Sequence, residues 1–317
     1  MNNATVAPTT VVITGATAGL GRATATRLVA AGHSVVVAAR DAARGEAAVR
    51  ALGPGAVTLP LDLADLESVH AFPSLLADAG LPQLGAVVAN AGIQFMDRTH
   101  VSADGFEATF ATNHLGHFAL ILDLLPHLAE HGRIVIVGSG THKSQRVRNF
   151  GFPPPQWDRA AALAEAGPGS GQVAYATSKL ANIATGFELR RRLPTLRPGA
   201  RIAVHTFDPG LMSDTDLSRN YPSTMRRAYM AATPLISRLL PGATTASASS
   251  KMLARLTIDP AFGDPPGRDI EFTRDGQPSA QARDETLARN LWDDSVALVN
   301  AARRGSPAPP AQSAPAR

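Results

Sequence analysis

A tyrosine and a lysine stand four positions apart at Tyr175 and Lys179, which places both side chains on one face of a helix. A free phenol has a pKa of about 10, too high for efficient proton transfer near neutral pH. One cation about 4 Å away contributes roughly 4 kcal/mol at an effective dielectric constant of 20, or about three pKa units. The pair could therefore pass a proton to or from a substrate oxygen.

A glycine-rich turn lies near the N-terminus, between an apolar run at residues 11–13 and an alanine-rich segment at residues 22–31 that is closed by Gly32. This order predicts a strand, a turn and a helix. Glycines let a backbone approach a phosphate, and a helix N-terminus offers free N–H groups. An ordinary strand–helix turn would look the same, so the pattern alone leaves both possibilities open. The candidate phosphate-binding residues are Gly15, Thr17, Gly19, Leu20 and Gly21.

The second predicted strand, residues 34–39, is followed by Arg40. An acidic residue near this point usually binds the ribose 2′-OH of NAD, whereas an arginine suits the 2′-phosphate of NADP. A charge-assisted hydrogen bond contributes roughly 1.5–3 kcal/mol, which corresponds to about a 10- to 150-fold preference for NADP. A solvated arginine at a strand end is the alternative. Asp41 lies too far along the chain to replace the missing acidic residue.

Four more apolar runs, each followed by turn residues, predict further strands at residues 56–61, 84–89, 133–137 and 200–207. Strands that are apolar throughout belong to a sheet buried on both faces. The sequence therefore predicts an α/β protein with a Rossmann-type, doubly wound parallel sheet, helices on both faces and a single domain over residues 9–304. Ligands of such sheets bind beyond the carboxyl ends of the strands. Candidate cofactor contacts at those ends are Asp62, Leu63, Asn90, Ala91, Gly92, Pro209 and Gly210, with Tyr175 and Lys179.

Together, these residues resemble the short-chain dehydrogenase/reductase family over residues 9–300. Within it, residues 112–118, 175–182 and 291–295 are similar to retinol dehydrogenases and protochlorophyllide reductases. The resemblance implies a catalytic tetrad of Asn113, Ser139, Tyr175 and Lys179. In it, Ser139 binds the substrate oxygen and Asn113 holds Lys179 through a water molecule. The resemblance also implies a homodimer formed through the helices that carry Asn113 and Tyr175.

The chain departs from the usual family pattern between Ser139 and Tyr175, where a long insert spans residues 143–171. Long loops are commonly functional or disordered, so we expect either a lid over the substrate or a solvated loop. A second segment, residues 211–242, follows Pro209-Gly210 and is rich in Leu, Met, Tyr and Pro, which indicates a largely apolar substrate. Candidate substrate contacts are His142, Leu211 and Met212.

Composition is typical of one large α/β domain, with 317 residues, 44% of them hydrophobic. The chain has no cysteines, which excludes thiol catalysis, and a net charge of +4, far from a nucleic-acid signature. His114 and His117 lack a third ligand at metal-site spacing, so we expect packing roles and no metal. We see neither a membrane-length apolar run nor a signal peptide and expect a cytoplasmic protein. Residues 1–8 and 305–317 are expected to be disordered.

These observations predict an NADP(H)-dependent carbonyl reductase or alcohol dehydrogenase with a bulky, lipophilic substrate, of which aromatic and polyketide-like molecules of secondary metabolism are examples. Two alternatives stay open. One is reduction of a C=C bond, as in protochlorophyllide reductases, although those enzymes rely on a cysteine that this chain lacks. The other is a non-catalytic NADP sensor, against which the intact tetrad argues.

Overall fold

An eight-stranded sheet forms the centre of the molecule in the computed structural model, which describes residues 8–143, 152–212 and 243–304. The strand order is β12-β11-β8-β6-β4-β1-β2-β3, and every neighbouring pair is parallel except β11 and β12. The Rossmann-type α/β fold expected from the sequence is confirmed. The strands are β1 (Thr10–Thr14), β2 (Ser34–Ala39), β3 (Ala56–Pro60), β4 (Leu84–Ala89), β6 (Leu128–Val137), β8 (Ala203–Asp208), β11 (Asp269–Glu271) and β12 (Arg274–Asp275).

The direction of winding reverses between β1 and β4. From β1 the chain moves outward through β2 to β3, then returns to β4 and continues through β6 and β8 on the other side. A reversal of this kind opens a crevice at the carboxyl ends of the two central strands, where ligands bind. Gly15 follows β1 and Asn90 follows β4, so both lie at this crevice.

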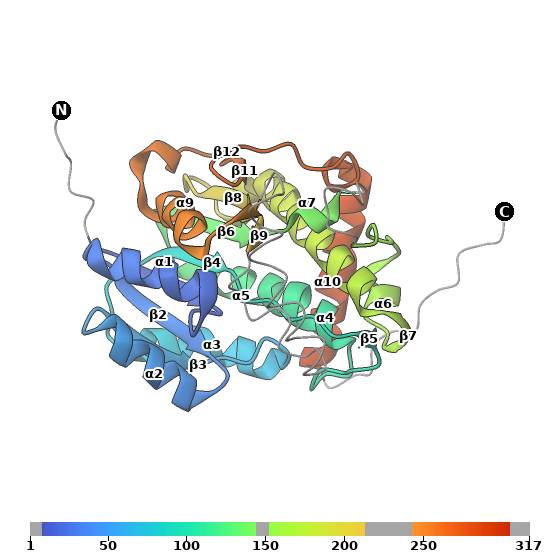
Figure 1. Cartoon of the computed structure of the whole chain (residues 1–317), viewed down its shortest axis with the longest axis horizontal. Helices are drawn as coiled ribbons and strands as arrows, with labels where there is room; N and C mark the ends of the chain where they lie inside the picture. The colour runs from blue at the N-terminus through green and yellow to red at the C-terminus, as the bar shows by residue number, and fades with distance from the viewer. Residues whose placement is uncertain (1–7, 144–151, 213–242, 305–317) are drawn as a thin grey trace.

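Helices cover both faces of the sheet (Figure 1). On one face α1 and α9 lie side by side, with α2 beyond them, and on the other lie α3, α5, α7 and α10. The bounds are α1 (Gly19–Ala30), α2 (Ala42–Leu52), α3 (Leu66–Asp78), α4 (Ala108–Phe110), α5 (Gly116–Leu124), α6 (Ala160–Leu163), α7 (Gly171–Leu196), α9 (Ala246–Ile258) and α10 (Glu285–Arg303).

Shorter elements complete the described chain. They are a π-helix at Ala111–Leu115, 3-10 turns at Leu125–His127, Gly140–His142, Pro260–Phe262 and Gln281–Arg283, and the small strands β5 (Asp97–Arg98), β7 (Gly167–Ser170), β9 (Leu211–Met212) and β10 (Ala243–Thr244). Across the described ranges, no helix combines the length and the apolar character needed to span a membrane. The ends expected to be disordered, 1–8 and 305–317, lie outside the described residues apart from Pro8.

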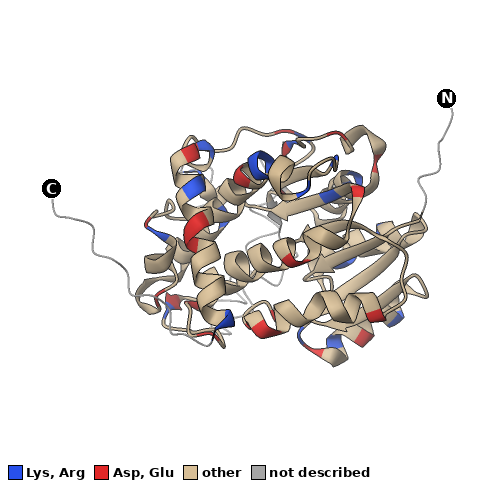
Figure 2. Cartoon of the chain, turned by 180° about the vertical axis from the view of Figure 1, so that it is seen from behind, with Lys and Arg blue, Asp and Glu red and all other residues tan. Residues whose placement is uncertain are grey.

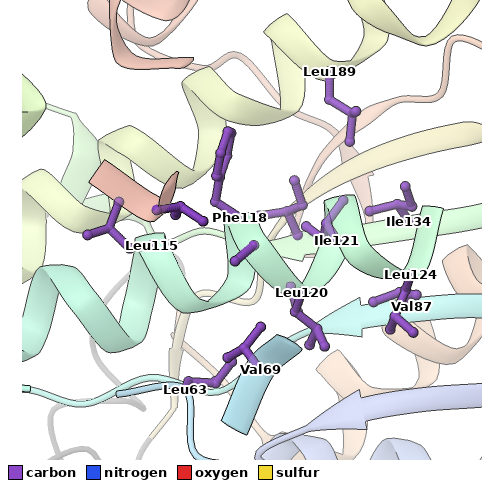
Figure 3. Packing of buried hydrophobic residues seen from close by; sticks show 14 of the residues in the cluster. Leu63, Val69, Val87, Leu115, Phe118, Leu120, Ile121, Leu124, Ile134 and Leu189 are labelled. Atoms are coloured by element: carbon purple, nitrogen blue, oxygen red, sulfur yellow. The ribbon is translucent and has the colours of Figure 1, made fainter. Parts of the chain in front are cut away.

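Strand residues alternate between two apolar cores. Val11 and Ile13 pack with α1 and α9, whereas Val12 packs with the α3, α5 and α7 side. In Figure 3, Phe118 and Ile121 of α5 lie among Ile134 of the sheet and other apolar side chains of this second core. Burying one such large side chain contributes roughly 1.5–3 kcal/mol. Charged residues lie mostly on helices and connections, with both signs mixed (Figure 2).

Most of the long helices begin at a side chain that satisfies free backbone N–H groups. Asp41 caps α2, Asp65 caps α3, Ser170 caps α7 and Asp284 caps α10. Such caps typically contribute about 1 kcal/mol each and fix where a helix starts. The helix α1 is different, because Ala18 at its start has no side chain that could cap it.

Candidate active site

The glycine turn between β1 and α1 is folded so tightly that two of its positions admit only glycine. Gly15 has a φ of +68°, and a Cβ there would lie 2.9 Å from Cα of Ala91. A Cβ at Gly21 would lie 2.4 Å from the carbonyl oxygen of Gly15. Thr17 and Gly19 between them are partly exposed, whereas Leu20 is buried. The backbone of this turn is thus compact and partly open to a ligand.

The N-terminus of α1 follows this turn with its first N–H groups left without a side-chain partner. Ala18 makes no capping hydrogen bond, and the first turn of the helix contains no acidic residue. Free N–H groups and the partial positive charge of the helix end favour an anion there. An uncapped start directly after a glycine turn suits a phosphate group.

Asn90, at the end of β4, braces the glycine turn from the neighbouring strand. Its Nδ2 donates to the carbonyl oxygen of Thr14 at 2.9 Å and to that of Gly15 at 3.4 Å. The backbone N–H groups of Asn90 and Ala91 both donate to Oγ1 of Thr14, each at 2.9 Å. The segment after β4 therefore fixes the shape of the turn, a supporting role that its position in the sequence alone does not reveal.

Tyr175 and Lys179 lie on α7, and both side chains are buried. The Lys179 ammonium lies 5.7 Å from the centre of the Tyr175 ring and donates a hydrogen bond to the carbonyl oxygen of Val137 at 3.1 Å. A Cβ added to Gly92 would lie 3.6 Å from Nζ of Lys179 and 3.7 Å from Oδ1 of Asn113. The structure thus brings Gly92, Asn113 and the tyrosine–lysine pair together beside the crevice.

Burial makes Lys179 a weaker base than an ordinary lysine. Removal from water lowers its pKa to about 8, and the nearby Asp208 carboxylate partly opposes this shift. Burial in turn raises the pKa of Asp208, which accepts a hydrogen bond from the Gly210 N–H at 2.9 Å. The acid at the end of β8 therefore helps to keep the lysine charged.

Asn113 lies in a π-helical turn, an irregular geometry that is common at functional sites. Its fully buried side chain exchanges two hydrogen bonds with the backbone of Ile93, at 2.8 and 3.0 Å. It also donates to Oγ of Ser178 at 3.0 Å, and Ser178 donates to the carbonyl oxygen of Tyr175 at 2.8 Å. Asn113 therefore anchors the helix that presents Tyr175 and Lys179.

Ser139 ends the loop after β6 and remains partly exposed. Its hydroxyl accepts a long hydrogen bond of 3.4 Å from the Thr141 N–H, which leaves its proton free to serve another group. His142 is expected from the sequence to contact the substrate, but the structure buries its side chain. Its ring is 2% exposed, with Nδ1 bonded to the Ser139 carbonyl oxygen and Nε2 accepting from the Ser279 N–H. The ring therefore stabilises the Ser139 loop from within the protein.

Arg40 extends into solvent after β2, and its side chain is 73% exposed. Its Nε lies 3.9 Å from the carboxylate of Asp62, a surface ion pair of the kind that contributes about 0–1 kcal/mol. Asp41 caps α2 and so has a local role. Leu63 is buried in the core. Arg40 and Asp62 thus end neighbouring strands at the same edge of the sheet.

The turn after β8 is held by side chains from other elements. Ser249 of α9 donates to the carbonyl oxygen of Pro209 at 2.8 Å, and Gly210 has a φ of +79°. Leu211 and Met212 form β9, which pairs with β10. The rest of the expected substrate segment, residues 213–242, lies outside the described residues.

The insert is described from residue 152 onward, and its helix α6 and strand β7 pack beside α7 and α10. Arg98 donates to three carbonyl oxygens in residues 162–165, and Asp294 of α10 binds Arg159. The Phe152 ring lies 6.1 Å from the ring of Tyr175. Residues 144–151 lie outside the described part of the chain. One aromatic side chain of the insert therefore reaches the tetrad.

Sequence reasoning missed three residues that the structure places at this site. Phe152 was visible only as one of several aromatic residues in the insert, and Asp208 only as part of a turn. His117 contacts the Asn113 carbonyl oxygen, and its position in the sequence indicated only a packing role.

Comparison with known proteins agrees with this geometry. A model of the short chain dehydrogenase family matches residues 9–150. Polyprenol dehydrogenase of Mus musculus is 34% identical to this chain, covering 92% of it and 83% of the relative. Retinol dehydrogenase 14 of Mus musculus is also 34% identical, with 92% and 85% covered. The chloroplastic protochlorophyllide reductase of Pisum sativum is 30% identical, with 92% and 78% covered.

Solved structures resemble the fold. A short chain dehydrogenase from Burkholderia cenocepacia in complex with NADP superposes with a TM-score of 0.57 at 26% identity, covering 78% of this chain and 90% of the other. A 3-ketoacyl-(acyl-carrier-protein) reductase from Brucella melitensis complexed with NADH gives a TM-score of 0.57 at 20% identity, with 80% and 92% covered. At 20% identity, the similarity to the Brucella melitensis reductase shows only that the two proteins share a fold.

Proposed function

This chain belongs to the short-chain dehydrogenase family, and we propose that within it the protein is an NADP(H)-dependent carbonyl reductase or alcohol dehydrogenase. Its substrate would be a ketone or aldehyde, or the matching alcohol, on a bulky lipophilic molecule. The observation that carries the proposal is the buried grouping of Tyr175, Lys179 and Asn113 beside the glycine turn.

The residues present fit a nicotinamide dinucleotide. Gly15 and Gly21 close a turn that any Cβ would disrupt, and the uncapped start of α1 leaves N–H groups for a pyrophosphate. Gly92 lies between that turn and the Lys179 ammonium, which suits the nicotinamide ribose. The glycine turn, Asp62, the segment 90–92 and Pro209-Gly210 would hold the cofactor, with Tyr175 and Lys179 at its reactive end. When bound, the cofactor supplies or accepts the hydride.

Arg40 supports NADP over NAD. Its guanidinium is exposed, and its ion pair with Asp62, at 3.9 Å, is weak enough to yield to a 2′-phosphate. An arginine binds phosphate with a planar fork of donors. The position directly after β2 holds this arginine and not the acidic residue that would bind the ribose 2′-OH of NAD. Structural relatives are solved with either cofactor, so the preference rests on this residue.

In the direction of reduction, the substrate carbonyl carbon gains a hydride and its oxygen gains the Tyr175 phenol proton. The C=O double bond becomes a C–O single bond, and the substrate gains two electrons that the nicotinamide loses. Ser139 would donate a hydrogen bond to the same oxygen and orient it. Tyr175 acts as the acid here and as the base in alcohol oxidation.

Lys179 favours the ionised phenol by its charge and stays in place through its bond to Val137. Asn113 holds the helix that carries both residues, through Ser178 and the Tyr175 carbonyl. These two residues therefore prepare the proton donor before substrate arrives. The arrangement is preorganised, which is where enzymes gain most from fixed charges and dipoles.

A lipophilic substrate is supported by the relatives and by the insert. Two relatives at 34% identity are named for the alcohols polyprenol and retinol. The Phe152 ring lies 6.1 Å from the Tyr175 ring, so an apolar side chain borders the place where the substrate carbonyl would be reduced. A hydrophobic wall of this kind would favour large rings or chains.

Reduction of a C=C bond is the second candidate, favoured by the 30% identity to a protochlorophyllide reductase. The chain contains no cysteine, the residue on which those enzymes rely. This difference makes C=C reduction the weaker candidate.

The test is a turnover screen with the intact protein. NADPH and NADH oxidation should be followed against large and small ketones, aldehydes, quinones and conjugated alkenes. We expect C=O reduction with NADPH and weaker activity with NADH. Reduction of the alkenes without the ketones would favour the second candidate. Tight NADPH binding with no turnover of any compound would favour the sensor.

A further inference from the structure

His117 links the strand that precedes the glycine turn to the backbone of Asn113. The ring lies on α5 and is 2% exposed, and both of its nitrogens have protein partners. Nε2 lies 2.8 Å from Oγ1 of Thr14, the last residue of β1. Nδ1 lies 3.0 Å from the carbonyl oxygen of Asn113.

The hydrogen bonds of Thr14 fix the tautomer of this ring. A hydroxyl has two lone pairs and one proton. Both lone pairs of Oγ1 are used by the N–H groups of Asn90 and Ala91. The proton is left for Nε2 of His117 at 2.8 Å, a much better distance than the 3.4 Å to the carbonyl oxygen of Val88. Nε2 therefore accepts, and Nδ1 carries the ring proton and donates it to Asn113.

The ring remains neutral at working pH. Burial lowers the pKa of His117, the bond to Asn113 partly opposes this shift and the positive charge of Lys179 adds to it, with a net pKa of about 4. A protonated ring would have two donors and could no longer accept from Thr14. The direction of both hydrogen bonds is thus fixed.

We propose that His117 is a positioning residue that couples the glycine turn to the catalytic helix. The bonded path runs from Thr14 through His117 to the Asn113 carbonyl, and from the Asn113 side chain through Ser178 to Tyr175. Binding of a cofactor at the turn would be transmitted along this path to the proton donor. The inference rests on the proposed function, because it assigns the chemistry to Tyr175.

The matched control is His114, on the preceding π-helical turn. It is 1% exposed, its Nε2 lies 2.9 Å from Oγ of Ser295 in α10, and its ring is also bonded to the Asn182 side chain of α7. His114→Phe and His117→Phe are therefore the same change at equal burial, with only one of them on the path. His117→Asn keeps a donor near the Nδ1 position and should restore most of the function.

Kinetics with NADPH and a ketone found in the turnover screen test the coupling. We expect His117→Phe to lower kcat about ten-fold, the effect of one hydrogen bond. His117→Asn should recover most of that loss, and NADPH affinity should change little in either variant. His114→Phe should lower thermal stability and leave kcat unchanged. Equal kcat in His117→Phe and the unmutated protein, or an equal loss in His114→Phe, would overturn the proposal.

A second readout needs no turnover and no substitution that could prevent folding. Long-range proton–nitrogen NMR spectra of histidine-labelled protein should show His117 as the neutral Nδ1–H tautomer, with nitrogen shifts that change when NADPH is added. An Nε2–H tautomer, or nitrogen chemical shifts that do not change when NADPH is added, would overturn the coupling. Inactivity of the unmutated protein toward every carbonyl would instead count against the proposed function, and the NMR result would still decide the path.

Discussion

Two opposing effects set the pKa of Lys179. Burial lowers this pKa, and the charge of Asp208 raises it. The outcome is a pKa of about 8, so the side chain is charged at neutral pH but not far above it. Asp208 also has a raised pKa, because it is buried as well. A change in the environment of either residue therefore alters the pH at which the Lys179 ammonium beside Tyr175 loses its proton.

Carbonyl reduction should lose rate as pH rises through about 8, because a lysine is charged only below its pKa. Loss of the Tyr175 proton at high pH acts in the same direction. Asp208→Asn removes the charge that raises the lysine pKa, so the fall in kcat should move to lower pH. A pH profile of kcat for both proteins measures this. An unmoved profile in the variant would show that the lysine does not control the rate.

Arg40 should set the cofactor preference. Arg40→Asp is expected to abolish or reverse a preference for NADPH of about 10- to 150-fold, the size of one charge-assisted contact. Arg50→Asp is the control, because Arg50 is 70% exposed and also forms a surface ion pair, but on the outer part of α2. Dissociation constants for NADPH and NADH decide the point. Equal dissociation constants for NADPH and NADH in the unmutated protein would contradict a role of Arg40 in cofactor preference.

At the scale of elements, α7 carries the two residues proposed for catalysis and also contacts the insert. It begins at the end of the insert, and Phe152 and Gln156 of the insert contact Tyr175 and Thr177. The described part of the insert is thus attached to α7, and it is held to α10 as well.

The insert should select substrate and leave cofactor binding unchanged. Phe152→Ala removes the ring beside Tyr175, so KM for a bulky carbonyl should rise several-fold while KM for a small one stays nearly constant. Phe187→Ala is the control, because Phe187 lies further along α7 and packs with Arg190. Parallel kinetics on both carbonyls give the answer. An equal loss on both after Phe152→Ala would make the insert a structural support and not a lid.

Much of the element order was predictable because buried parallel strands are apolar runs. The strands at 34–39 and 84–89 were predicted with the observed bounds. The strand expected at 133–137 begins earlier, at Leu128, because its first five residues are not a continuous apolar run and include Glu130 and His131. The short strand β11 and the edge strand β12 were missed, since they are two or three residues long and mostly charged. Short strands of this kind depend on their neighbours and not on an apolar pattern.

The spacing of Tyr175 and Lys179 indicates a shared helix face, and the other two members of the expected tetrad, Asn113 and Ser139, come only from the family resemblance. Nothing in the order of residues shows that Asn90 braces the glycine turn or that Asn113 is bonded to Ser178. These contacts join segments far apart in the chain. Only the fold brings them within hydrogen-bonding distance.

At the scale of the molecule, the helices expected to form a dimer are already covered by the chain itself. No residue from 108 to 124 or from 171 to 190, all within the described ranges, is exposed. Trp292 of α10 packs edge-on against Phe118 of α5, and α10 runs beside α7. Along these residues the chain leaves no exposed face for a partner, although α7 has exposed residues between 191 and 196. We therefore predict a monomer in place of the dimer that the family resemblance implies.

Sedimentation velocity on the intact protein checks the oligomeric state. We expect the mass of one 317-residue chain over a wide range of concentration. Displacing α10 would expose a large apolar surface, so association through α5 or α7 should be strongly disfavoured. A dimer whose cross-links map to either helix would show that α10 moves away from the core in solution.

The central claim is that Tyr175 supplies the proton for hydride transfer, and Tyr175→Phe tests it most directly. The substitution keeps the buried ring and removes only the hydroxyl, so folding and NADPH affinity should be retained. We predict that kcat for carbonyl reduction falls by at least about 100-fold, the lower end for general acid catalysis. A variant that binds NADPH and keeps most of its kcat would contradict the proposed mechanism.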